Sequence, residues 1–155
     1  MKATLCSLLE LEYDSVCNFL EYEDWWFRME SVLNDNGYSW GTRFFNEKKM
    51  DLWYPTDCFV PFRQISDGYK LSDIMPEDTI GGFLFGSVLS PHNFNSQNLN
   101  EGLHMVVIDA NCNIVHDPNP EYAGIDHYPL SRLLGFNGVL EAWGVRKLTD
   151  KINEK

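Results

Sequence analysis

The sequence lacks any long hydrophobic run. No stretch approaches the roughly 18 to 20 apolar residues that are needed to span a bilayer. The first residues also lack the basic segment and apolar run of a secretory signal. We therefore expect a cytoplasmic protein without a membrane partner.

Basic residues are scarce as well. The chain has 12 Lys and Arg against 23 Asp and Glu, a formal net charge of −11. Nucleic acids and anionic lipid surfaces repel such a chain, which argues against both as partners. The first 36 residues contain eight acids but only two basic side chains, Lys2 and Arg28. A solvated acidic face is the usual explanation, and a basic partner surface is the alternative.

The four cysteines form no recognisable metal or disulfide pattern. Cys6, Cys17, Cys58 and Cys112 are widely spaced, without a CxxC pair or a histidine at zinc-ligand spacing. We expect reduced thiols, no metal site and no cofactor.

The sequence has enough apolar and aromatic residues to form a hydrophobic core. Apolar residues make up 44% and aromatic residues 14% of the 155 positions. A chain of this length buries roughly 70% of its unfolded surface without metal or disulfide. We expect one folded domain over residues 1–155, and no internal repeat is present.

Helical patterns come first along the chain. The run TLCSLLEL at 4–11 has leucines at helical spacing and predicts a helix that begins at or before the first residue. A short helical turn is expected over 16–20. A second helix has Glu23 and Asp24 in its first turn and ends at Asn36-Gly37. Its apolar stripe consists of Trp26, Met29, Val32 and Leu33.

Strand patterns follow. Irregular β structure and long loops are expected from Gly37 to about Glu77, and the region 42–79 carries no motif that can be placed. A strand is expected over 80–89, with glycines where another backbone approaches closely. The segments 103–109 and 113–117 predict a β-hairpin around 110–112, and a final strand is expected over 139–145. Helices followed by antiparallel strands predict an α+β fold, with the helices packed on the sheet.

The histidines differ in setting. His92 lies in a polar loop and His127 in a turn, which favours surface or hydrogen-bonding roles. His104 and His116 lie on the two strands of the hairpin. Antiparallel pairing brings His104 beside Asp117 at one end of the sheet, where a carboxylate can orient an imidazole. A buried histidine satisfied by a neighbouring carboxylate is the structural alternative.

The block around these two residues resembles a known family. GLHMVVIDANCNIVHDPNP, at 102–120, is similar to the H-x-V-V and V-H-D-P-x-P block of papain-like cysteine peptidases of the C39 type, especially small phage and bacterial proteins. KATLCSLLELEYDSVCNFLE, at 2–21, resembles the helix that follows their nucleophilic cysteine. The resemblance implies a papain-like fold with His104 as catalytic base and Asp117 as its orienting acid, at the mouth of a cleft that faces the amino end of the first helix.

The resemblance also implies a position for the nucleophile. In the family pattern the cysteine stands two residues before the pair that Lys2-Ala3 matches, which is the position directly before Met1. Cys6 is the nearest substitute, but on a helix it lies about 9 Å along the axis and roughly 240° around from that position. We expect Cys6 to be buried or turned away. The other cysteines match no nucleophile position and are interpreted as small core or surface residues.

Three functions remain open. The first is a papain-like thiol hydrolase or acyl transferase with a peptide or acyl substrate and an upstream cysteine. The second is a pseudoenzyme, a phage-encoded binding or inhibitor protein that would lie in the host cytoplasm and present its acidic face to a basic host protein. The third is a small-ligand pocket in the aromatic middle, for which core packing is the preferred explanation. Its residues are Trp40, Phe44, Phe45, Trp53 and Tyr54.

Overall fold

The computed structural model describes residues 1–46, 70–92, 102–122 and 125–149. The predictions made for Trp53 and Tyr54 of the aromatic middle and for Cys58 concern residues outside these ranges. The main helices are α1 (Lys2–Leu9), α2 (Trp25–Asp35) and the short α4 (Ser131–Leu134). The strands are β1 (Tyr38–Phe45), β2 (Phe83–Leu89), β3 (Leu103–Asp109), β4 (Ile114–His116) and β5 (Glu141–Lys147). Short 3₁₀ turns are present at 13–15 and 19–21, and only the second overlaps the helical turn that was expected over 16–20.

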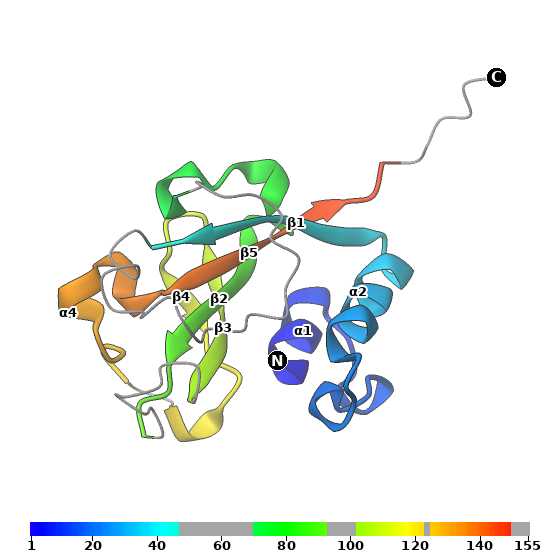
Figure 1. Ribbon diagram of the computed structural model, residues 1–155, viewed down its shortest axis with the longest axis horizontal. Helices are drawn as coiled ribbons and strands as arrows, with labels where there is room; N and C mark the ends of the chain where they lie inside the picture. The colour runs from blue at the N-terminus through cyan, green and yellow to red at the C-terminus, as the bar shows by residue number, and fades with distance from the viewer. Residues whose placement is uncertain (47–69, 93–101, 123–124, 150–155) are drawn as a thin grey trace.

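The five strands form one antiparallel sheet in the order β1-β5-β2-β3-β4. In Figure 1, α1 and α2 lie together on one side of the sheet, and α4 lies at the opposite end. The predicted α+β class is confirmed. None of the helices in the described part of the chain is both long and apolar enough to cross a membrane.

The first helix docks on the centre of the sheet. Leu5, Cys6 and Leu8 are buried against β2 and β3, where their neighbours include Phe85 and Val107. A hydrogen bond of 2.9 Å from Thr4 Oγ1 to the carbonyl oxygen of Met105 fixes the first turn beside the start of β3. The leucine spacing that predicted this helix therefore also predicts its buried face.

Alternation along the strands divides the core into two layers. On β3, Met105 and Val107 belong to the cluster under α1, whereas Val106 and Ile108 belong to the cluster on the opposite face. Successive strand residues point to opposite faces, and both faces of this sheet are covered. The central strands are for this reason almost continuously apolar.

The β structure expected after Gly37 is confirmed over 38–45, where β1 pairs with β5 from the far end of the chain across a bulge between Trp40 and Arg43. Two predicted boundaries were wrong. The strand expected over 80–89 begins at Phe83, since Gly81 and Gly82 adopt positive φ in a tight turn. The last strand runs two residues later than expected, over 141–147.

Smaller differences concern the second helix and the glycines. Helix α2 begins at Trp25 with Asp24 as its N-cap residue, so Glu23 precedes the first turn. The close approach expected at a strand glycine is made by a side chain. A Cβ at Gly86 would lie 2.6 Å from Ile108 Cγ2. Glycine is required there because any side chain would displace Ile108.

Candidate active site

The β3–β4 hairpin brings His104 and Asp117 together. His104 is the second residue of β3, and Asp117 directly follows β4. The two strands are joined over 110–113, one residue longer than expected, and Cys112 in this connection takes a left-handed conformation. His104 Nε2 lies 2.7 Å from Asp117 Oδ1, and the two side chains are 18% and 9% exposed. The contact expected from the sequence is therefore present.

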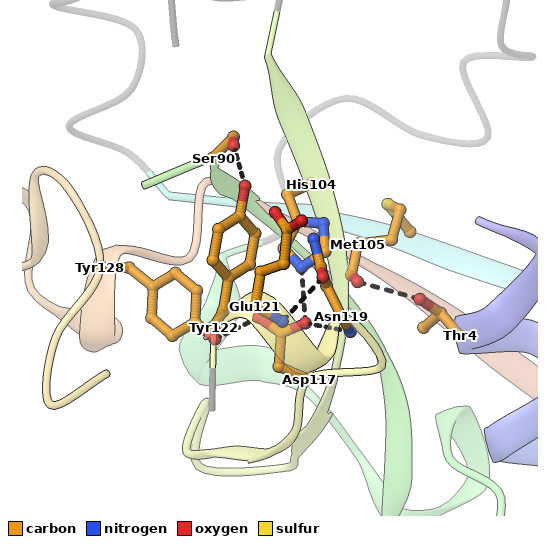
Figure 2. A network of polar contacts seen from close by, with 9 residues as sticks. All are labelled: Thr4, Ser90, His104, Met105, Asp117, Asn119, Glu121, Tyr122 and Tyr128. Atoms are coloured by element: carbon orange, nitrogen blue, oxygen red, sulfur yellow. Dashed lines mark hydrogen bonds and ion pairs between the residues drawn. The ribbon is translucent and has the colours of Figure 1, made fainter. Parts of the chain in front are cut away.

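Asp117 is held by two further donors (Figure 2). The backbone N–H of Asn119 donates to Oδ1 at 2.8 Å, and the Tyr128 hydroxyl donates to Oδ2 at 2.5 Å. Burial raises the pKa of Tyr128, and the hydrogen bond to Asp117 raises it further, so the phenol remains a donor. A carboxylate with both oxygens fixed in this way presents one defined orientation to the imidazole.

Tyr122 holds the imidazole from the side. The ring of Tyr122 meets that of His104 edge to face, with centroids 5.1 Å apart. Its hydroxyl lies 2.6 Å from Ser90 Oγ, which fixes the ring at its other end. Sequence reasoning missed Tyr122, Tyr128 and Ser90. The only sign of them in the sequence is that two tyrosines follow the Asp-Pro-x-Pro turn closely. Such proximity along the chain does not specify which groups the tyrosines contact.

The second ring nitrogen of His104 is available for chemistry. In the described part of the chain, Nδ1 has no hydrogen-bond partner. When the Nε2–H donates to Asp117, the neutral ring has Nδ1 as its proton acceptor. This is the tautomer that a general base requires.

A cavity of about 360 Å³ lies between the start of β3 and the amino end of α1. His104 and Met1 both line it. The remaining lining residues are Leu20, Trp25, Arg43, Ser87, Gly102, Leu103, Met105, Glu141 and Trp143. The expected juxtaposition of the histidine with the amino end of the first helix is thus found at one cavity.

The other histidines lie apart from this arrangement. His92, His116 and His127 are exposed. His116 and His127 line a second, wider hollow of about 640 Å³, which borders the Asp117 side of the pair. Among the described residues no group of three histidine, cysteine or acidic side chains is arranged to hold a metal ion.

None of the cysteines that the structure describes is placed as a nucleophile. Cys6 is 5% exposed within the core under α1, and burial raises the pKa of its thiol. Burial raises the pKa of Cys112 to about 12. Cys17 is half-buried beside the helices. The expectation that Cys6 is buried is confirmed, and a high pKa keeps such a thiol protonated and unreactive.

Comparisons of the chain with protein-family models, with curated proteins and with solved structures find no match.

Proposed function

We propose that this chain is a papain-like thiol hydrolase or acyl transferase domain, in which His104 is the general base and Asp117 orients it. The observation that carries the proposal is the 2.7 Å contact from His104 Nε2 to a carboxylate held by two other donors, with Nδ1 left as acceptor. A structural histidine–carboxylate pair needs no cavity at its side, whereas this pair adjoins one.

The nucleophile of the proposed reaction is a cysteine directly before Met1. That position is at the amino end of α1, where backbone N–H groups and the helix dipole stabilise a thiolate. The thiol proton passes to His104 Nδ1, and the thiolate attacks the acyl carbon. The imidazolium then gives the proton to the leaving amine, and water or a second acceptor takes the acyl group from sulfur.

The test is a chain with one cysteine inserted before Met1. We expect iodoacetamide to alkylate this thiol at pH 6 more than about tenfold faster than an unpaired thiol, because ion pairing with the imidazolium keeps it ionised. Adding His104→Ala removes the acceleration, and mass spectrometry separates the inserted thiol from the four cysteines of the native chain. Equal rates with and without His104 contradict the proposal. The upstream reading frame gives an independent test, since an in-frame stop without a cysteine codon excludes a native enzyme.

A binding protein for a basic partner is the second candidate, and the surface of the first 36 residues favours it. Seven of the eight acids in this segment are exposed. Large apolar side chains are exposed among them, with Leu20 at 71% and Phe27 at 68%. Acidic groups around exposed apolar ones are typical of a protein interface rather than of a merely solvated helix.

This second candidate is tested with a lysine- and leucine-rich peptide as probe. We expect binding that weakens as salt is raised, because exposed charges are screened beyond a Debye length of about 8 Å at physiological ionic strength. Glu23→Lys should weaken it strongly, while Asp35→Lys, at the far end of α2, serves as the charge-matched control. Binding that does not depend on salt concentration contradicts this candidate. Binding that both variants weaken equally contradicts it as well.

A further inference from the structure

The cavity beside His104 contains a buried hydroxyl group that makes no hydrogen bond. Ser87 is 1% exposed, and its Oγ has no partner among the described residues. Ser87 is two residues from Phe85 on β2, so strand alternation places it on the face that α1 covers. A buried polar group without a partner lowers stability, which calls for a water or a ligand that satisfies it.

The floor of the cavity around Ser87 is polar but carries no net charge. Arg43 donates from Nε at 2.9 Å and from Nη2 at 2.5 Å to Glu141 Oε2, and the two side chains are 10% and 5% exposed. Glu141 is also the residue opposite Ser87 across the β2–β5 pairing. The two charges compensate each other, and burial lowers the pKa of the Met1 amino group, so the cavity disfavours a charged group.

The walls of the cavity are apolar. They consist of the side chains of Met1, Leu20, Trp25, Leu103, Met105 and Trp143. The volume of about 360 Å³ lies at the lower end of the range for small-molecule sites. Apolar walls above a neutral polar floor match a ligand with an apolar stem and an uncharged polar end.

We propose that this cavity binds a glutamine-like side chain of the substrate, a carboxamide on an apolar stem, and that Ser87 is the residue that selects it. A carboxamide both donates and accepts, as does the serine hydroxyl, so one contact satisfies both groups. The assignment of this ligand to a substrate rests on the proposed function, because it places the bound residue next to the acyl group that His104 would act on. The binding chemistry itself does not depend on a thiol.

The binding test uses three small probes, the N-acetyl amides of glutamine, glutamate and norleucine. Methionine methyl groups labelled with ¹³C report on the site, since Met105 lines the cavity while Met29 lies 1% exposed in the core. We expect the glutamine probe to shift the Met105 signal saturably and to leave Met29 unchanged. The glutamate and norleucine probes should each bind at least about fivefold more weakly. The cavity disfavours the charge of glutamate, and norleucine cannot form a hydrogen bond with Ser87.

Variants identify the contact. Ser87→Ala should weaken the glutamine probe about five- to tenfold and leave the norleucine probe unchanged. Ser39→Ala, on β1 and outside the cavity lining, should change neither. No shift with any probe, equal affinity for glutamine and norleucine, or an unchanged affinity in Ser87→Ala each overturns the proposal.

The two proposals fail separately. Probe binding without acceleration of the inserted cysteine refutes the enzyme and leaves a carboxamide-binding cavity. Accelerated alkylation without probe binding supports the enzyme and refutes the selectivity of Ser87.

Discussion

Two polar regions meet at His104, and they differ in how completely their groups are hydrogen-bonded. Around Asp117, both carboxylate oxygens, the Tyr128 hydroxyl and the Tyr122 hydroxyl all have partners. In the neighbouring cavity the Ser87 hydroxyl has none. A satisfied network fixes one geometry, whereas an unsatisfied group in a cavity gains free energy when a ligand arrives. The difference indicates that one set of residues orients the His104 imidazole and that a separate set is suited to recognising a ligand.

The largest effect is expected at the ion pair of the cavity floor. Glu141→Ala leaves the Arg43 guanidinium buried without its carboxylate, and we expect a loss of about 3 kcal/mol in the free energy of unfolding. Burial lowers the pKa of Arg43 to about 10, so the side chain is still charged near neutral pH. Urea denaturation measures the loss. The double variant Arg43→Met with Glu141→Leu should lose less than Glu141→Ala alone, and a greater loss contradicts the view that the unpaired charge is the cause.

A smaller effect is expected at Tyr128. Tyr128→Phe removes a hydrogen bond to a buried carboxylate, which should lower the free energy of unfolding by about 1.5 to 2 kcal/mol. If Tyr128 positions Asp117, the same change also alters the pH profile of alkylation in the chain with the inserted cysteine. A stability loss with an unchanged profile would leave Tyr128 as a purely structural residue.

Two buried serines three residues apart sharpen the comparison. Ser90→Ala removes the partner of the buried Tyr122 hydroxyl and should cost about 1 kcal/mol. Ser87→Ala removes a hydroxyl that has no partner and should be neutral or slightly stabilising. Thermal unfolding of both variants side by side gives the answer. A cost at Ser87 equal to that at Ser90 would mean that Ser87 is already satisfied, for example by a bound water.

The sequence predicted the parts of the site that depend on local structure. The hairpin turn sets the pairing of β3 and β4, and this places His104 beside Asp117 although they are 13 residues apart. The leucine spacing of α1 likewise predicts burial of Leu5 and Leu8. Both inferences need only the spacing of apolar residues along the chain and the position of a turn.

The parts that the sequence did not predict depend on distant contacts. The pairing of β1 was not predicted, because its partner β5 lies about a hundred residues further on and a bulge between Trp40 and Arg43 interrupts the alternation of β1. The contact of Tyr122 with Ser90 joins an irregular turn to the end of β2, and the cavity combines residues of four strands with Met1. No local pattern encodes such combinations. The catalytic roles of His104 and Asp117 stay predictions.

The smallest effect is expected at Asp109, the other aspartate of the hairpin. Its carboxylate accepts the backbone N–H groups of Asn111 and Asn113 and the Asn113 side chain, all within four residues. Partial burial alone would raise the pKa of Asp109, but these hydrogen bonds outweigh it and the pKa lies below its usual value. The stabilisation is therefore present above about pH 4 and is lost as the pH falls through the lowered pKa.

Asp109→Asn should accordingly be slightly less stable than the native chain at pH 7, and the difference should vanish in acid. Urea titrations between pH 7 and pH 2 measure it. Because all donors to Asp109 are local, the variant should leave alkylation of the inserted cysteine unchanged, unlike Tyr128→Phe. If Asp109→Asn altered alkylation as strongly, the hairpin as a whole, rather than the donors to Asp117, would orient His104.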